Sequence, residues 1–112
     1  MKKPSITARE RDIERFLKDE VQKLGGWCPK WVSPGNMGVP DRICFFPNGL
    51  IVFVEVKAPG KKPTKLQTIQ IKRLNNYKQE AVVIDSKENV KIFIETVLEL
   101  HTSKGEEQND NE

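Results

Sequence analysis

The sequence predicts one α/β domain with the order helix, three strands, helix, strand, helix and a mixed central sheet. The first observation is that apolar residues recur at helical spacing over about 8–24, 64–74 and 87–101. The second is that short runs rich in β-branched residues fill 39–57 and 81–84, bounded by proline, glycine and polar residues. A chain of 112 residues can bury one modest core but not two.

The first helix is expected from about Ala8 to Leu24. Thr7 and Glu10 have the spacing of a capping box, and two glycines follow Leu24. At about 100° per residue, Glu10 lies about 40° from the centre of the apolar stripe and Glu14 about twice as far, so Glu10 is better placed to point inward. The alternative is that Glu10 only caps the helix and Glu14 only faces water. The stripe consists of Ile13, Phe16, Leu17, Val21 and Leu24.

A short strand is expected over Trp27 to Val32. Pro29 interrupts it, which indicates an edge or bulged position because proline cannot donate to a sheet. Residues 33–38 then form a loop that leads to Pro40-Asp41. Pro40 biases the preceding residue toward an extended conformation, which suits entry into the next strand.

The next two strands form a hairpin whose loop length decides which side chains share a face. A three-residue loop, Pro47-Asn48-Gly49, places proline and glycine at the positions that a type I turn with a left-handed third residue favours. This loop pairs Phe46 with Leu50 and, by extrapolation, Asp41 with Glu55. A two-residue Asn-Gly turn would not place the two acids on one face.

The second hairpin strand has one apolar and one charged face. Successive strand residues point to opposite sides, so Glu55 and Lys57 project together. A carboxylate and an ammonium therefore lie side by side, with Asp41 across from them. The opposite face consists of Leu50, Val52, Val54 and Val56.

A basic segment and a second helix follow. Lys61, Lys62 and Lys65 surround Pro63 and could attract a phosphate backbone, although a charged loop in water is the alternative. Thr64-x-x-Gln67 has the capping-box pattern and opens a helix through about Leu74.

The last elements are a buried strand at Ala81–Ile84 and a helix from about Lys87 to His101, preceded by the capping residues Asp85-Ser86. We expect residues 1–104 to form the domain. Residues 105–112 are polar and acidic and are expected to be a disordered tail.

Composition is typical of a soluble globular protein, with 37% hydrophobic and 31% charged residues. No apolar run approaches the roughly 18 residues of a membrane span, and no leader resembles a signal peptide, so we expect a cytoplasmic protein. Cys28 and Cys44 lack CxxC spacing, and His101 is the only histidine. The sequence therefore indicates neither a zinc cluster nor a disulfide framework.

Charge is unevenly distributed along the chain. The formal net charge is +3, but the last eight residues hold four acids and no base. Residues 1–104 thus carry nineteen basic against twelve acidic residues, a net charge of +7. This balance favours a polyanionic partner such as nucleic acid, with a solvated lysine-rich surface as the alternative.

Pro40-Asp41 followed by Glu55-x-Lys57 resembles the PD-(D/E)xK signature of restriction-enzyme-like nucleases. A longer pattern is similar to the VRR-Nuc family within that superfamily. It consists of the segments GVPDR and FVEVKAPGKK, followed by a glutamine-bearing helix. The resemblance extends from about Glu10 to about Val90. It implies a restriction-endonuclease-like α-β-β-β-α-β core with an additional C-terminal helix, in agreement with the order of elements above.

The resemblance also implies a Mg²⁺ or Mn²⁺ site. Its ligands would be Asp41, Glu55, the main-chain carbonyl of Val56 and, more distantly, an acid on the first helix, for which Glu10 matches better than Glu14. Lys57 would hold the attacking water and offset charge on the phosphate.

Further residues acquire expected roles from the same resemblance. Gln67 occupies the family's glutamine position and would orient the water or a phosphate, with a helix cap as the alternative. Lys30 and Ser33 lie in the segment beside the active centre of the family, with packing and turn formation as the alternative. The expected nucleic-acid contacts are Lys30, Ser33, Arg42, Lys61, Lys62 and Lys65.

The implied function is metal-dependent hydrolysis of phosphodiester bonds in DNA. Small free-standing VRR-Nuc proteins, common in phages, resemble Holliday-junction resolvases, and a homodimer would place two sites on the symmetric strands of a four-way junction. Trp27, Trp31 or the last helix could form the dimer surface. The alternatives are cleavage of flaps or other branched or single-stranded DNA, a non-catalytic nucleic-acid-binding module, and an assembly subunit.

Overall fold

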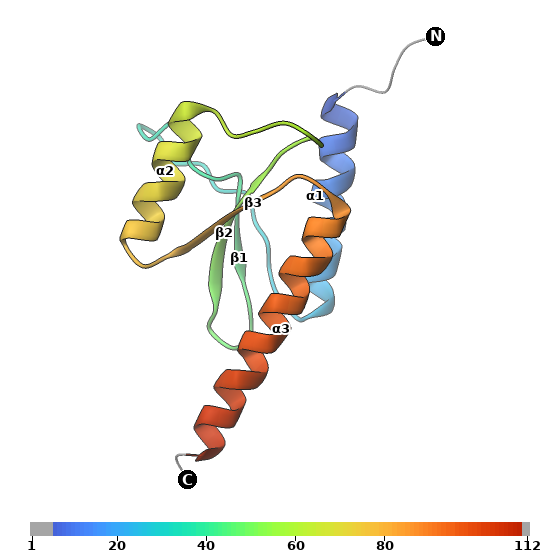
Figure 1. Ribbon diagram of the computed structural model, residues 1–112, viewed down its shortest axis with the longest axis vertical. Coiled ribbons are helices and arrows are strands. Elements are labelled where there is room, and N and C mark those ends of the chain that lie inside the picture. The colour runs from blue at the N-terminus through green and yellow to red at the C-terminus, as the bar shows by residue number, and fades with distance from the viewer. Residues whose placement is uncertain (1–5, 111–112) are drawn as a thin grey trace.

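A three-stranded sheet separates two packed helices from a third (Figure 1). The computed structural model describes the backbone of residues 6–110 and the side chains of residues 9–100. Helices α1 and α3 lie side by side on one side of the sheet, and α2 lies on the other. The elements are α1 Ile6–Lys23, β1 Arg42–Phe45, β2 Ile51–Val56, α2 Lys65–Asn76, β3 Glu80–Ile84 and α3 Lys87–Asp110.

The sheet is mixed, as the sequence predicted, with the strand order β1-β2-β3. Strands β1 and β2 form an antiparallel hairpin, whereas β2 and β3 are parallel. A parallel pair needs a crossover connection, which α2 supplies. The parallel pairing places Val56 beside Ile84, and the N–H of Lys57 donates to the carbonyl of Ile84 at 2.8 Å.

The three-residue hairpin loop is confirmed. Arg42 pairs with Val54 and Phe45 with Ile51, and the N–H of Phe46 donates to the carbonyl of Leu50 at 2.9 Å. Gly49 has a φ of +88°, the left-handed conformation that glycine adopts without steric cost. Extending this register by one residue places Asp41 opposite Glu55.

The segment after α1 runs antiparallel beside β1 as an edge, although it forms isolated bridges and no continuous strand. Trp27 and Phe45 exchange two main-chain hydrogen bonds of 2.9 and 2.8 Å, and Lys30 bridges to Arg42. Pro29 accepts from the N–H of Ile43 but has no N–H to return. The ladder is therefore incomplete at the position where the sequence predicted an interruption.

The hydrophobic core lies between the sheet and the pair α1 and α3. Strand β2 contributes the predicted alternating valines, and both helices contribute one apolar stripe each. The most deeply buried core side chains are Leu17, Val21, Cys44, Val54, Val56, Ile84 and Val90.

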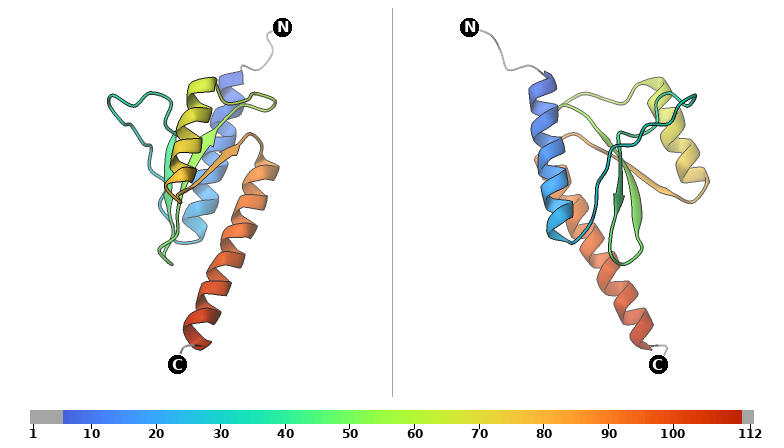
Figure 2. Two further views of the ribbon diagram at one scale, coloured as in Figure 1. Left: turned by 60° about the vertical axis from the view of Figure 1, so that its left-hand side comes forward. Right: turned by 180° about the vertical axis from the view of Figure 1, so that it is seen from behind.

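The opposite face of the sheet is covered by α2 and by the loop before β1. The amide of Gln70, a buried residue of α2, donates to the carbonyl of Met37 at 3.0 Å. Gly38 has a φ of +86°, and a Cβ there would lie 2.9 Å from the Leu66 side chain. The loop therefore lies against the first turns of α2 (Figure 2).

Two helix ends differ from the prediction. Helix α1 extends over Ile6–Lys23 in the described residues, so Thr7 lies within the helix and not before its predicted start near Ala8. Helix α3 continues to Asp110, past the end predicted near His101. The side chain of His101, those of the acidic tail, and residues 111–112 lie outside the described residues, so the disorder expected for 105–112 stays a prediction.

Within residues 6–110, no helix is long and apolar enough to cross a membrane.

Substitution of Gly49 tests the turn. Gly49→Ala should lower the free energy of unfolding by about 1 kcal/mol, because alanine resists the left-handed conformation and no atom lies within 4 Å of the new Cβ. Gly49→Asn is the matched control and should cost less, since asparagine tolerates this conformation. Urea unfolding measures both variants. Equal losses for alanine and asparagine would contradict this explanation of the turn.

Candidate active site

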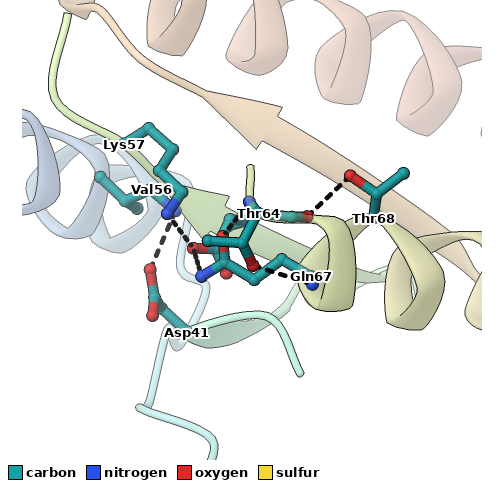
Figure 3. A network of polar contacts seen from close by, with 7 residues as sticks. Asp41, Val56, Lys57, Thr64, Gln67 and Thr68 are labelled. Carbon is teal, nitrogen blue, oxygen red and sulfur yellow. Dashed lines mark hydrogen bonds and ion pairs between the residues drawn. The ribbon is translucent and has the colours of Figure 1, made fainter. Parts of the chain in front are cut away.

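Two carboxylates converge at the open end of the hairpin. Oδ2 of Asp41 accepts a hydrogen bond from the main-chain N–H of Val56 at 3.1 Å, which ties the residue before β1 to the end of β2 (Figure 3). Glu55 precedes Val56 and lies opposite Asp41 in the hairpin register. The structure therefore brings together the two acids of the PD…ExK pattern.

Glu55 is buried, with 2% of the residue exposed. Its Oε2 atom accepts a hydrogen bond from Nε2 of Gln67 at 3.0 Å and lies 3.6 Å from Nζ of Lys57. Its Oε1 atom is also buried, and among the described residues it has no hydrogen-bond partner. A carboxylate oxygen without a partner in a buried position is costly unless another group interacts with it.

The electrostatics of the two acids favour a bound proton or a bound cation. Burial raises the pKa of Glu55 to about 7, and the negative charge of Asp41 adds to the shift, while Lys57 opposes it. Loss of hydration also raises the pKa of Asp41, against the hydrogen bond from Val56. Each acid is thus less stable as an anion than in water.

Gln67 forms the helix cap that was the alternative prediction for it and also contacts Glu55, whereas its expected role toward water or a phosphate stays a prediction. Its Oε1 atom accepts from the N–H of Thr64 at 2.8 Å, while Oγ1 of Thr64 accepts from the N–H of Gln67 at 3.2 Å. This reciprocal pair is a capping box that begins α2. The Nε2 atom of the same side chain reaches Glu55, so the capped end of the helix lies directly at the site (Figure 3).

The donor set fits a hard divalent cation. Asp41 and Glu55 supply carboxylate oxygens, the ligand type that Mg²⁺ and Mn²⁺ prefer, and Oε1 of Glu55 has no protein partner in the described chain. The described residues hold no cluster of three or more acidic, histidine or cysteine side chains at metal-binding distance. Any further direct ligand of the same ion would then be main-chain oxygen, water or substrate, as is usual for Mg²⁺.

The structure distinguishes the surroundings of the two candidate acids on α1, Glu10 and Glu14. Glu10 is partly buried. Glu14 forms an ion pair with Arg42, 3.2 Å between Oε1 and Nη2, and its charge contributes to the raised pKa of Asp41. The role predicted for Glu10 as a distant ligand stays a prediction.

Arg42 is in the protein interior, although the sequence suggested it as a DNA contact. The residue is 5% exposed and donates from Nη1 to the carbonyl of Cys28 at 2.7 Å. Its pairing with Val54 places it on the core face of the sheet, toward Glu14 of α1. This guanidinium therefore links α1, the edge segment and β1.

The other predicted contact residues lie at the surface or in turns. Ser33 begins a turn in which the N–H of Asn36 donates to its carbonyl at 3.0 Å and the Asn36 amide donates to its Oγ at 3.1 Å. The four lysines among the predicted contacts are exposed: Lys30, Lys61, Lys62 and Lys65.

Two contacts near the site were not predicted from the sequence. Gln70 of α2 holds the loop before β1, but its position in the sequence indicates only that it lies on one side of a helix. Cys28 and Cys44 lie side by side across the edge of the sheet, their Sγ atoms 2.9 Å apart. The register of the edge segment with β1 would have predicted the cysteine pair, because 28 and 44 follow the same pairing as 27 with 45.

Comparisons with known proteins agree with this geometry. No protein-family model matches the chain. Over 80 residues it is 50% identical to "Putative nuclease p44" of Acyrthosiphon pisum secondary endosymbiont phage 1, covering 71% of this chain and 86% of that protein. A solved VRR_NUC domain superposes with a TM-score of 0.74 at 30% identity, covering 78% of this chain and 95% of that domain.

These two similarities extend over most of the phage protein and nearly all of the solved domain, and they confirm both the fold and the family that the sequence motifs resemble. The chain belongs to the VRR_NUC family and is a nuclease of that type.

Proposed function

We propose that this protein is a divalent-metal-dependent endonuclease that hydrolyses phosphodiester bonds in branched DNA. The observation that carries the proposal is the convergence of Asp41 and Glu55 beside Lys57, with one oxygen of Glu55 buried and unpartnered among the described residues. A buried acid with a raised pKa, such as Glu55, in a cluster of charged groups is typical of catalytic sites.

Asp41 and Glu55 would hold Mg²⁺ or Mn²⁺, together with the main-chain carbonyl of Val56 and, more distantly, Glu10. Such an ion lowers the pKa of bound water and neutralises charge on a phosphate. The raised pKa values of both acids support this assignment, because the site favours a positive partner at the carboxylates.

Lys57 would act on the reacting phosphate. Its ammonium lies 3.6 Å from Glu55, and its side chain is only 16% exposed, so its charge is less screened than that of a surface lysine. We assign it the roles of positioning the attacking water and stabilising charge that develops on the phosphoryl oxygens. Gln67 positions the Glu55 carboxylate through its hydrogen bond.

The DNA backbone would contact the exposed lysines around this site. Lys61 and Lys62 follow the end of β2, and Lys65 begins α2. Lys30 and Ser33 belong to the segment that leads toward Asp41. Arg42 is left out of this set because its guanidinium is buried.

For the substrate we favour a four-way junction cut by a homodimer. Two copies related by a two-fold axis would present two sites to the two symmetric strands of the junction. If the protein is phage-encoded, it would act in the host cytoplasm. Flaps and other branched or single-stranded DNA are the alternative substrates.

Replacement of Lys57 tests the catalytic assignment. Lys57→Ala should reduce the turnover of a synthetic four-way junction, with Mg²⁺ or Mn²⁺ present, by at least about 100-fold, because charge on the phosphate is no longer offset. Its affinity for the same DNA should change by less than about threefold. Single-turnover cleavage and a binding titration in Ca²⁺ measure the two quantities separately.

Two other lysines provide the controls. Lys91→Ala removes an exposed charge on α3 and should change neither quantity, whereas Lys65→Ala should weaken DNA binding and reduce its salt dependence. Paired symmetric nicks would support a dimeric resolvase. Cutting of flaps alone would mean that flaps, and not four-way junctions, are the substrate. Intact DNA binding without metal-dependent cleavage of any substrate would support a non-catalytic binding module instead.

The pH dependence of stability tests Glu55. In the metal-free protein the free energy of unfolding should fall by about 2 to 3 kcal/mol as the pH rises from about 4.5 to about 7, at about 1.4 kcal/mol per pH unit. Over this range the folded protein keeps a proton on Glu55 that the unfolded chain has released. Urea unfolding in the presence of a chelator measures the loss.

Glu55→Gln and Mn²⁺ are the controls for this measurement. The variant cannot titrate at position 55 and should lose most of the pH dependence. Saturating Mn²⁺ above about pH 7 should restore stability to the wild type, because the ion replaces the proton, but not to the variant. An unchanged pH dependence in Glu55→Gln would show that other groups cause it.

A further inference from the structure

The cysteine pair lies outside the proposed active site and has no part in it. Sγ of Cys28 is 2.9 Å from Sγ of Cys44, and both residues are buried, with exposed fractions of 7% and 0%. Both are free thiols. Two thiols at this distance can share a hydrogen bond, and they can also be joined covalently if the main-chain geometry allows it.

The main-chain geometry suits a disulfide. Trp27 and Phe45 exchange both of their main-chain hydrogen bonds, so the next pair, Cys28 and Cys44, occupies a non-hydrogen-bonded position. Cα atoms at such positions are about 4.5 Å apart, within the range of about 4.4 to 6.8 Å that disulfides span. A bond between the two sulfurs therefore requires little movement of the main chain.

One of the two cysteines borders a surface hollow. Cys28 lines a surface hollow of about 310 Å³, whereas Cys44 does not. The other lining residues are Lys18, Gln22, Gly26, Trp27, Pro29 and Arg42. A peroxide or a water molecule is small enough for this hollow, which borders Cys28 but not Cys44.

The surroundings also shift the pKa values of the two thiols in opposite directions. The hydrogen bond from Cys44 lowers the pKa of the Cys28 thiol, and the positive charges of Arg42 and Lys18 lower it further, against the effects of burial and Glu14. The same hydrogen bond and burial raise the pKa of Cys44. Cys28 is thus the better nucleophile, since the thiolate is the reactive form.

We propose that Cys28 and Cys44 are a peroxide-reactive thiol pair that closes to an intramolecular disulfide. The Cys28 thiolate attacks one oxygen of hydrogen peroxide, which breaks the O–O bond and gives a sulfenic acid and, after protonation, one water. The Cys44 thiol then attacks that sulfur, forms the S–S bond and releases the second water. The two sulfurs lose two electrons in total, and peroxide gains them.

The disulfide would fix the edge segment to β1 close to the active site. The carbonyl of Cys28 accepts from Arg42, and farther along the segment the N–H of Trp31 donates to the carbonyl of Asp41 at 2.8 Å. The bond closes a loop that contains the whole of the segment before Asp41. Oxidation therefore restrains residues 28–44, a loop that includes Asp41, and the thiol chemistry itself does not depend on nuclease activity.

The first experiment treats the reduced, full-length protein with hydrogen peroxide, then alkylates it with N-ethylmaleimide under denaturing conditions. Intact-mass and peptide analysis should find a monomer lighter than the reduced chain by about 2 Da, with both cysteines protected from alkylation. The same chain oxidised in guanidinium chloride should form this bond more slowly. Disulfide-linked dimers, or sulfinic acids in place of the bond, would overturn the proposal.

Single substitutions test the order of the two steps. Cys44→Ser, or Cys44→Ala if serine disturbs folding, should stop at a sulfenic acid on Cys28 that dimedone traps. Cys28→Ser should leave the Cys44 thiol unreacted while the protein remains folded by circular dichroism. Equal trapping at the two cysteines would contradict the assignment of Cys28 as the attacking thiol.

Thermal unfolding gives a second, independent readout. The oxidised wild type should melt about 5 °C or more above the reduced form, because the disulfide restrains the unfolded chain. Peroxide should not raise the melting temperature of Cys44→Ala. An oxidised protein that melts at or below the temperature of the reduced form would contradict the fit of the bond to the folded sheet.

Discussion

The register of the β1–β2 hairpin is the constraint on which the rest of the structure depends. A slip of one residue in a hairpin moves every side chain of one strand to the other face. In the observed register the valines of β2 meet α1 and α3, and Asp41 lies across from Glu55. The turn at residues 47–49 therefore determines the core and the candidate active site together.

Burial of Glu55 distinguishes the Glu55–Lys57 pair from an ordinary ion pair at the surface. An exposed Glu–Lys pair would contribute little, about 1 kcal/mol or less. Here the glutamate is almost completely removed from water, held by Gln67 and Lys57, with one oxygen lacking a partner in the described chain. Such a group lowers the stability of the unliganded protein, and this is common in sites that bind ions or substrates.

Most of the fold could be predicted from local patterns in the sequence. Hairpin length, the Thr64–Gln67 capping box and the Ser86 cap, which accepts from the N–H of Asn89, depend on neighbouring residues alone. The start of α1 could not be predicted as well, because the helix includes Thr7, which the capping pattern with Glu10 had placed before it. The end of α3 was also placed too early.

The site was predicted in outline, but its burial was not. Asp41, Glu55 and Lys57 follow from strand parity, whereas the enclosure of Glu55 depends on where α2 packs. The charge of Arg42 suggested a contact with DNA, but its pairing with Val54 places it on the core face of the sheet. There it donates to Glu14 and to the Cys28 carbonyl.

The contacts of Gln67 explain why position 67 requires an amide. The third position of a capping box accepts glutamate or glutamine equally well, because the helix needs only an acceptor for the N–H of Thr64. The carboxylate of Glu55 needs a donor from the same side chain. Only an amide offers an acceptor and a donor at its two ends, and asparagine is one carbon shorter. Two requirements therefore determine the residue type at position 67. The start of α2 needs a hydrogen-bond acceptor, and Glu55 needs a donor.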